Sequence, residues 1–368
     1  MFDVFPTARL RPSPFFHAIK AEGCTSASIY NRMILPASFG DPDKEYWDLI
    51  ERCVMWDVGA ERQVQLEGPD AGKLAQIISA RDLSKMKIGQ GKYVPICNHQ
   101  GVLINDPICL KLRDDLYWFS VADSDIWFWA RAIAAERGLN VEVSEPDVSP
   151  LAVQGPMAED VVASICGDWV RDLKYFWFKE AEINGIPVAV QRSGWSKQGG
   201  FEIYLRDGER GLELWNIVKE AGQPYGIGNG GPTSPERVES GLVSVGSDTD
   251  GKTNPFEAGL GRFVNLDVPD DVIGIQALRR INEEGPARRM VGIRLEGDEP
   301  DPFGFHWENI MIDDEKIGSL TNSVFSPRLR KNIGYGLVRA DTKLGEQVQV
   351  IRSRTHTVNG LVVEMPFI

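Results

Sequence analysis

Alternating hydrophobic and polar residues predict two strands joined by a glycine-rich turn near the middle of the chain. The run 186–190 is apolar, and 201–205 alternates as half-buried strands do. The turn at 192–200 holds three glycines, which let a backbone approach a ligand closely because they lack a Cβ. Trp195 adds a flat aromatic face, and Glu202 adds a carboxylate at the start of the second strand. The stretch is either a hairpin with one exposed tryptophan or a platform for a flat, polar-edged ligand that lies on Trp195 and is hydrogen-bonded by Glu202.

The pattern before this stretch predicts elements that mix helices and strands. Prolines are expected to keep the first forty residues extended and without a helix. A helix is then expected to begin with Asp41 as its N-cap and Pro42 in its first turn. Strand and helix patterns follow over 62–143 and again over 148–225. These residues are therefore expected to have an α+β fold.

After residue 225 the pattern changes twice. The Ser-Pro pair at 234–235 predicts a helix start. Arg237 lies on a face of this helix where it is either solvated or recognises a ligand. From residue 286 to residue 368, short alternating strands replace the helical patterns and predict a small β-barrel. The buried stripe of the predicted helix consists of Val238, Leu242 and Val245.

Composition narrows the class of protein. The 368 residues include 40 basic and 53 acidic side chains, and the net charge of −13 argues against nucleic acid or an anionic membrane as a partner. The five cysteines are scattered without a C-x-x-C pair, which is typical of reduced thiols in the cytoplasm. The chain start shows no signal-peptide pattern, and no apolar run approaches the roughly 18 residues of a membrane span. We therefore expect a cytoplasmic protein that acts on small molecules.

Few residues point to chemistry by themselves. Asp106 follows Asn105 at the end of an apolar run, and a carboxylate there must be solvated, paired or part of a site. The common hydrolase, metalloprotease and P-loop motifs are absent, and four histidines far apart in sequence make a metal site unexpected. The ten tryptophans would suit a cationic ligand through cation–π attraction of roughly 0.5–2 kcal/mol. The residues alone indicate a folate- or nucleobase-like binder with a carboxylate site.

The order of short motifs along nearly the whole chain resembles the aminomethyltransferase (glycine-cleavage T-protein) family. The matching segments are 81–93, 98–106, 151–156, 200–203, 237–241, 317–327, 334–336 and 365–367. Within the family, the chain resembles the branch that demethylates dimethylsulfoniopropionate (DMSP), through 29–36, 56–58, 61–64, 121–125, 192–200 and 254–257. Glycine-cleavage members carry a Tyr-Thr-Gly-Glu type of turn where this chain has Trp195-Ser196-Lys197-Gln198. This difference argues against glycine cleavage as the reaction.

The resemblance implies a three-domain cloverleaf with two mixed α/β-sheet (ferredoxin-like) domains and a C-terminal antiparallel β-barrel. The first α+β domain would consist of residues 1–50 and 145–235, which include the N-terminal arm and the glycine-rich turn. The second would consist of 51–144 and 236–285, and the barrel of 286–368. Tetrahydrofolate would run through the centre.

The resemblance also implies a reaction and a set of residues. A methyl group would move from a small sulfonium donor, with DMSP as the best candidate, to N5 of tetrahydrofolate, giving 5-methyltetrahydrofolate and methylmercaptopropionate. The alternatives are another small S-, N- or O-methyl donor, or an aminomethyltransferase like the T-protein. No metal is expected, and a homodimer is left open. Asp106 would be the catalytic carboxylate; the folate-binding residues would be Glu202, Trp195, Arg237 and Gln154; and the residues of the donor site would be Tyr30, Trp177, Phe201 and Tyr204.

Overall fold

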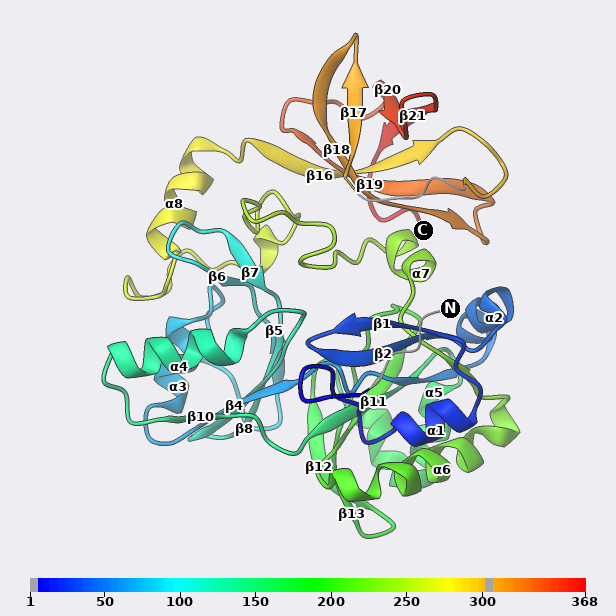
Figure 1. Cartoon of the computed structure of the whole chain (residues 1–368). Helices are drawn as coiled ribbons and strands as arrows, with labels where there is room; N and C mark the ends of the chain where they lie inside the picture. The colour runs from blue at the N-terminus through cyan, green and yellow to red at the C-terminus, as the bar shows by residue number, and fades with distance from the viewer. Residues whose placement is uncertain (1–5, 302–306) are drawn as a thin grey trace. The chain divides into compact units, whose positions relative to one another are not determined.

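The computed structural model describes residues 6–301 and 307–368, so the chain start, where no signal peptide is expected, lies outside it (Figure 1). Contacts between segments divide the chain into two compact units, and each unit is built from three segments. The boundaries of the three implied domains stay a prediction. The first unit consists of Met1–Ala75, Lys85–Tyr93 and Pro107–Pro232, and the second of Gln76–Ser84, Val94–Asp106 and Thr233–Ile368.

Two sheets form the frame of the first unit. The six-stranded sheet has the order β12-β13-β14-β11-β3-β15 and is antiparallel except where β15 runs parallel to β3. Its strands are β3 (Val54–Asp57), β11 (Ser149–Gln154), β12 (Phe178–Ile183), β13 (Ile186–Gln191), β14 (Gly200–Leu205) and β15 (Gly228–Gly230). The predicted strands on both sides of the glycine-rich turn are thus confirmed. The five-stranded sheet, in the order β10-β4-β9-β8-β5, contains β4 (Gln63–Glu67), β5 (Gly91–Tyr93), β8 (Ile108–Arg113), β9 (Leu116–Ser120) and β10 (Glu142–Ser144).

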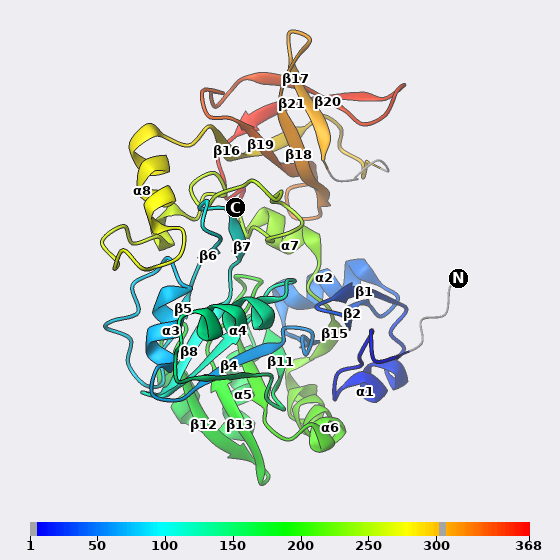
Figure 2. The ribbon, with the colours of Figure 1, turned by 60° about the vertical axis from the view of Figure 1, so that its left-hand side comes forward.

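Helices cover one face of the six-stranded sheet. Its main core joins α5 and α6 to that face, through Val161 and Val162 on α5 and Leu214, Trp215 and Val218 on α6. Burying these apolar side chains stabilises the packing by roughly 1.5–3 kcal/mol each. Helices α3 and α4 lie beside the five-stranded sheet (Figure 2). The α-helices are α1 (Phe16–Ala21), α2 (Pro42–Glu51), α3 (Ala71–Ile77, which ends in the second unit), α4 (Ile126–Glu136), α5 (Ala158–Cys166) and α6 (Gly211–Gly222).

The N-terminal segment departs from its prediction in one respect. The prediction that it carries no helix is wrong, because α1 forms between Pro14 and Pro36, where a short apolar stretch packs Ala18 and Ile19 into the core. The helix expected at Asp41 is confirmed, and the Asp41 carboxylate accepts the Lys44 N–H at 3.0 Å. Strands β1 (Ser26–Tyr30) and β2 (Met33–Ser38) form a separate hairpin.

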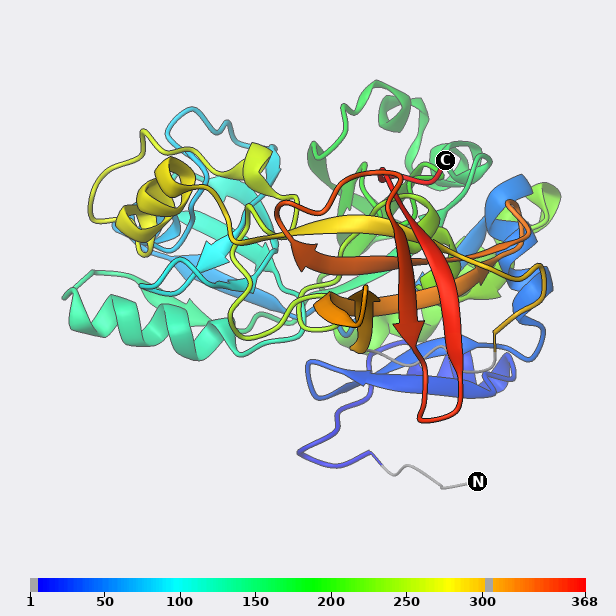
Figure 3. The same cartoon turned by 90° about the horizontal axis from the view of Figure 1, so that it is seen from above.

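The second unit contains the predicted barrel, which is confirmed as a closed sheet of six strands in the order β16-β19-β18-β17-β20-β21 (Figure 3, yellow to red). Its strands are β16 (Arg288–Leu295), β17 (Glu308–Ile312), β18 (Glu315–Ser326), β19 (Lys331–Arg339), β20 (Gln347–Ile351) and β21 (Thr357–Val363). A two-stranded ladder, β6 (Ile96–Cys97) and β7 (Leu103–Asn105), and the helices α7 (Ser234–Glu239) and α8 (Ile275–Glu284) complete the unit.

Helix α7 begins where the sequence predicts, with a capping box between Thr233 and Glu236. The expected stripe of three buried residues is wrong, because the helix ends at Glu239 and both Leu242 and Val245 lie beyond it. Gly241 has φ +71°, which turns the chain out of the helix. In the described part of the chain, no helix is long and apolar enough to cross a membrane.

Candidate functional site

Strand β14 presents its residues alternately to the two faces of the six-stranded sheet. Phe201, Ile203 and Leu205 are buried in the core on the helix side. Tyr204 packs instead with Trp118 of β9, at a ring-centroid distance of 6.5 Å, in the core that joins the two sheets. Glu202 lies on the same face as Tyr204, so Phe201 and Glu202 point to opposite sides of the sheet. The structure therefore does not bring Phe201 together with the other candidate residues of this strand.

Glu202 is held on one oxygen by two hydroxyl groups. The Ser193 hydroxyl donates to Oε2 at 2.6 Å, and the Tyr204 hydroxyl donates to the same atom at 2.9 Å. Among the described residues no hydrogen bond reaches the other oxygen, Oε1, although the side chain is only 6% exposed. Burial raises the pKa of Glu202 above its ordinary value, and the two hydroxyl groups act in the opposite direction. The site thus offers one carboxylate oxygen with acceptor capacity at the end of a buried network.

Tyr204 supports this hydrogen-bond network from the buried side. It is fully buried, and its hydroxyl lies 3.1 Å from Gln191 Oε1 as well as 2.9 Å from Glu202. Burial, followed by the charge of Glu202, raises the pKa of Tyr204 well above its ordinary value, so the phenol stays a proton donor. This position makes Tyr204 a support of Glu202 and keeps its ring away from solvent.

Gln154 lies inside the glycine-rich turn and shapes it. Its amide nitrogen donates to the backbone oxygens of Ser193 and Phe201 at 3.1 and 3.5 Å, and its amide oxygen accepts the Ser196 hydroxyl at 2.8 Å. A Cβ on Gly194 would lie 2.0 Å from this amide, and φ there is +149°. The glycine is therefore required by both its backbone angle and the close approach of Gln154. The side chain predicted to bind folate is 1% exposed and holds the turn in place.

The aromatic residues gather around the same turn. Trp195 is half-buried within it. The Tyr175 hydroxyl donates to the Gly194 carbonyl at 3.3 Å, and the Arg192 N–H donates to the Trp177 carbonyl at 3.0 Å. The segment that contains Trp177 therefore runs alongside the turn that contains Trp195. The structure brings these two candidates to the same end of the six-stranded sheet.

Tyr30 lies at the tip of the β1–β2 hairpin, elsewhere in the first unit. The two turn residues, Asn31 and Arg32, have φ of +51° and +61°, as a two-residue hairpin turn that matches strand twist requires. The Asn31 amide nitrogen donates to the Ala60 and Val121 carbonyls, both at 3.0 Å, and its backbone N–H donates to Asp123 at 2.8 Å. The tip that carries Tyr30 is thus anchored by a buried side chain next to it.

Two candidates, Asp106 and Arg237, belong to the second unit. Asp106 directly follows β7, is half-buried, and donates its backbone N–H to Asn105 Oδ1 at 3.0 Å. Arg237 is 3% exposed, so the expectation of a solvated side chain is wrong, and its recognition of a ligand stays a prediction. Its Nη1 donates to Asp248 Oδ2 at 2.6 Å and to the Leu242 carbonyl at 3.1 Å.

Sequence reasoning missed two members of the Glu202 network, Gln191 and Ser193. Gln191 is the polar residue that ends the apolar run of β13, and the register places it opposite Glu202. A polar residue at the end of such a run, facing a carboxylate across the pair, is the signal that could have indicated it. Ser193 gives no comparable signal, since serine is ordinary in a turn.

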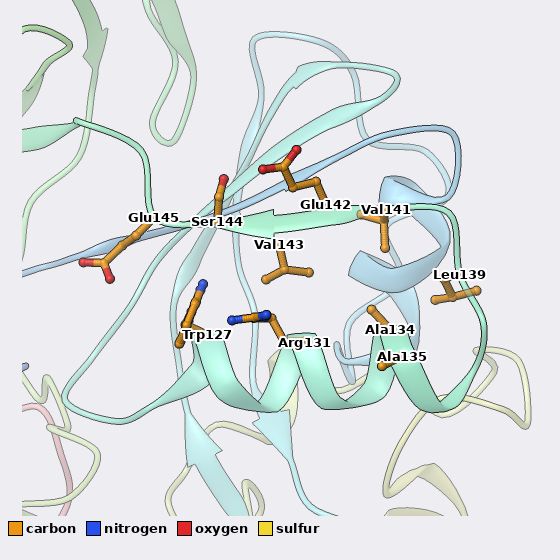
Figure 4. A pocket seen from close by; sticks show the side chains of 10 residues that line it. All are labelled: Trp127, Arg131, Ala134, Ala135, Leu139, Val141, Glu142, Val143, Ser144 and Glu145. Carbon is orange, nitrogen blue, oxygen red and sulfur yellow. The ribbon is translucent and has the colours of Figure 1, made fainter.

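A hollow of about 530 Å³ elsewhere in the first unit lies between α4 and the segment 139–145 (Figure 4). The Arg131 guanidinium lies over the Trp127 ring at 4.6 Å, and Glu142 and Glu145 add carboxylates to the rim (Figure 4). None of the candidate residues lines this hollow. It is therefore separate from the Glu202 network.

Comparison with known proteins gives matches over almost the entire chain. Residues 15–268 match the model of the GCVT N-terminal domain, and residues 288–368 match that of the glycine cleavage T-protein C-terminal barrel domain. Dimethylsulfoniopropionate demethylase DmdA of Ruegeria pomeroyi is 42% identical over 92% of this chain and 92% of its own length. An aminomethyltransferase of Caldanaerobacter subterraneus subsp. tengcongensis is 31% identical over 90% of this chain and 89% of its own length.

The fold also occurs in solved structures. The glycine cleavage system aminomethyltransferase T from Bartonella henselae superposes with a TM-score of 0.85, covering 97% of this chain and 98% of its own. Its sequence identity of 21% makes it evidence for the fold alone.

Proposed function

Because this chain belongs to the glycine-cleavage T-protein family, we propose that it is a tetrahydrofolate-dependent methyltransferase. The substrate we propose is DMSP, whose methyl group would pass to N5 of tetrahydrofolate. The dimethylsulfoniopropionate demethylase relative, 42% identical along nearly its whole length, supports this choice of donor. We also propose that the enzyme works in the cytoplasm, since its five cysteines are free, as thiols are in reducing compartments.

The observation that carries the proposal is the arrangement around Glu202. A pterin ring presents an edge of adjacent N–H donors, and a carboxylate oxygen is the acceptor that pairs with such an edge. Oε1 of Glu202 has that capacity, while Oε2 is held by Ser193 and Tyr204. Trp195, in the adjoining turn, offers a face for a flat ring. The residues present therefore fit a reduced folate.

The proposed donor suits a site without a covalent nucleophile. A sulfonium methyl is already activated, because the C–S electron pair leaves with sulfur as a neutral thioether. A bond forms from N5 to the methyl carbon as the C–S bond breaks, and N5 then loses its proton. The protein mainly has to hold the reacting atoms in line, about 3–3.5 Å apart. Aromatic faces such as that of Trp177 would stabilise the cation without neutralising it.

Asp106 is the residue proposed to act on the proton. A carboxylate can accept the N5 proton as the amine is alkylated, or can orient the folate by accepting a hydrogen bond. Its half-buried position after β7 leaves both roles available. A donor without a positive charge, such as an amine or an ether, would need a second acid for its leaving group. This requirement distinguishes the proposed sulfonium donor from those alternatives.

The aminomethyltransferase relatives support a second candidate function. An aminomethyltransferase acting with a lipoyl carrier would have the same fold and folate site. The Trp195-Ser196-Lys197-Gln198 turn, which differs from the glycine-cleavage pattern, makes it the weaker candidate.

The test is an assay of purified protein with tetrahydrofolate and DMSP, in which 5-methyltetrahydrofolate and methylmercaptopropionate are quantified by mass spectrometry. Equal amounts of both products are expected. Turnover with a different methyl donor, and none with DMSP, would overturn the donor and retain the family chemistry. Glycine-dependent turnover with a lipoyl carrier would favour the second candidate.

Replacing Glu202 tests the folate site itself. Glu202→Ala should raise the Kd for tetrahydrofolate at least about a hundredfold, since two charge-assisted hydrogen bonds are lost at about 1.5–3 kcal/mol each. Glu182→Ala is a matched control, because Glu182 is an exposed carboxylate on β12 of the same sheet. Equal affinity in both variants would refute the assignment of Glu202.

A further inference from the structure

Gln191 is a buried amide whose orientation is fixed. It ends β13, pairs with Glu202 across the sheet and is fully buried. Its amide nitrogen donates to the Phe176 carbonyl at 3.2 Å. Its amide oxygen must therefore point the other way, and it lies 3.1 Å from the Ser193 hydroxyl and 3.1 Å from the Tyr204 hydroxyl.

A neighbouring strand reinforces this orientation. The Gly91 N–H donates to the same Phe176 carbonyl at 2.6 Å. A Cβ on Gly91 would lie 2.4 Å from the Gln191 amide nitrogen, so glycine is what allows the approach. Phe176 itself has φ +65°, a backbone conformation that a bulky residue adopts only when its surroundings impose it. These contacts hold the Gln191 amide from both sides.

The Ser193 and Tyr204 hydroxyls have fewer protons to donate than there are acceptor contacts around them. Ser193 and Tyr204 each lie within hydrogen-bond distance of both Glu202 Oε2 and Gln191 Oε1. A hydroxyl group has one proton to donate. Two protons therefore serve four contacts, and each proton given to Gln191 is withdrawn from Glu202. The contacts to Glu202, at 2.6 and 2.9 Å, are the shorter ones.

We propose that Gln191 is a positioning residue for Glu202, whose amide oxygen competes for the Ser193 and Tyr204 protons and so sets how firmly the carboxylate keeps its negative charge. An ionised Glu202 draws both protons to Oε2. When Glu202 is neutral, the Ser193 and Tyr204 hydroxyls can donate to the Gln191 oxygen instead. The two buried hydroxyls therefore still have a hydrogen-bond acceptor. Gln191 thus stabilises the neutral form relative to a site without an alternative acceptor.

The charged groups around Glu202 do not outweigh the effect of the two hydroxyl groups on its charge. Besides burial, the charge of Glu202 raises the pKa of both Tyr175 and Tyr204, and Glu61 also raises that of Tyr204. Among the described residues no cation forms an ion pair with Glu202. Arg192, at the start of the turn, is paired with Glu159 and lies over the Phe201 ring at 4.9 Å, on the opposite face of the sheet. Burial raises the pKa of Glu202, and the two hydroxyls are the groups that lower it.

The experiment measures the titration of Glu202 by carbon-detected NMR of ¹³C-labelled side-chain carboxyls, with the signal assigned by its loss in Glu202→Gln. Gln191→Met removes the competing acceptor and should lower the titration midpoint by about half a unit or more, because both protons then serve the carboxylate. Ser193→Ala and Tyr204→Phe each remove a proton and should raise the midpoint by a similar amount. If the Met variant does not fold, Gln191→Asn, which withdraws the amide by one methylene, should shift the midpoint in the same downward direction.

If Gln191 had only a structural role, its variants would not shift the Glu202 midpoint in the direction opposite to the Ser193 and Tyr204 variants. A midpoint that rises or stays fixed in the Gln191 variants would overturn the inference. Its effect on ligand binding rests on the proposed function: the acid limit of tetrahydrofolate binding should move in parallel with the midpoint. If the midpoint moves as expected and folate binding does not follow, the folate assignment fails and the positioning role stands.

Discussion

The ion pair between Arg237 and Asp248 should hold the second unit together, and its removal is the sharpest test of how Arg237 contributes. The two side chains are 4% and 0% exposed. Asp248 Oδ2 accepts hydrogen bonds from Arg237 Nη1 at 2.6 Å and from the Ser244 N–H at 2.7 Å. The Tyr335 hydroxyl, from barrel strand β19, donates to the Arg237 carbonyl at 2.9 Å. The pair therefore connects α7, the segment after it and the barrel.

Asp248→Ala would leave the Arg237 cation buried without its carboxylate. Breaking a buried pair in this way destabilises a fold by about 3–5 kcal/mol, because the remaining charge cannot be solvated. Arg237→Ala should produce a loss of the same order, since it strands the Asp248 carboxylate. The double variant should lose much less than the sum of the two single losses, because neither charge is then left alone. Asp267→Ala, at an exposed position of the same unit, is the control and should change stability by less than about 0.5 kcal/mol.

Urea unfolding can be followed in the second unit alone. Trp307 is the one tryptophan that the sequence places in that unit, and it packs in the same apolar cluster as Tyr335. With 5-fluorotryptophan, its ¹⁹F signal, assigned through Trp307→Phe, reports on this unit. A loss below about 1 kcal/mol in Asp248→Ala would refute the reasoning. A direct folate contact by Arg237 predicts a different result, in which Arg237→Ala weakens folate binding far more than Asp248→Ala when both are measured on folded protein.

Three further predictions follow from single contacts. Burial raises the pKa of Asp57 from 3.8 to about 6, so this group stabilises the fold below pH 4 and the contribution is lost as pH rises through 6. At pH 7 the lost stability is about 3 kcal/mol. Asp57→Asn should therefore flatten the pH dependence of the free energy of unfolding in urea between pH 4 and 6. An unchanged slope in this variant would contradict the prediction. Gly194→Ala should impair folate binding at least tenfold and lower Tm, since its Cβ would meet Gln154 at 2.0 Å; adding Gln154→Ala should recover part of the Tm loss if the contact is the cause. Asn31→Ala removes two buried hydrogen bonds at about 1 kcal/mol each. It should raise KM for the methyl donor, measured by steady-state kinetics, with little change in the folate Kd, measured by calorimetry. An unchanged donor KM would show that the hairpin tip is not part of the donor site.

The parts of the fold that could be predicted are those that a local pattern determines. Alternation around the glycine-rich turn predicted β13 and β14 nearly to the residue, and the loss of helical patterns predicted the barrel. Helix α1 was missed because prolines dominate the pattern there, whereas packing against the core decides the local structure. The length of α7 was misjudged because the helical spacing of apolar residues continues to Val245, whereas the helix ends at Glu239 and Gly241 turns the chain away from it.

The candidate site shows the same division. Alternation already implies that Phe201 and Glu202 face opposite sides of their strand, so a donor site that contains Phe201 and a folate site that contains Glu202 would lie on different faces of the sheet. The burial of Arg237 could not be predicted, because it depends on Asp248, a carboxylate eleven residues later in an irregular segment. Which polar residues contact Glu202 depends on strand order and register, which are set by pairing between distant segments.

Two buried glutamines, one on either side of β14, explain why the turn between β13 and β14 needs its sequence. Gln154 ends β11 opposite Gly200, and Gln191 ends β13 opposite Glu202. A glutamine amide has both a donor and an acceptor end, so each residue can hold two different partners at once. Both ends of the Gln154 amide form hydrogen bonds with the turn and fix its backbone. The Gln191 amide nitrogen donates to the Phe176 carbonyl, and its oxygen faces the hydroxyls beside the carboxylate. The backbone shape of the turn and the charge of its carboxylate are thus controlled separately, and substitutions at the two glutamines should impair ligand binding with different dependence on pH.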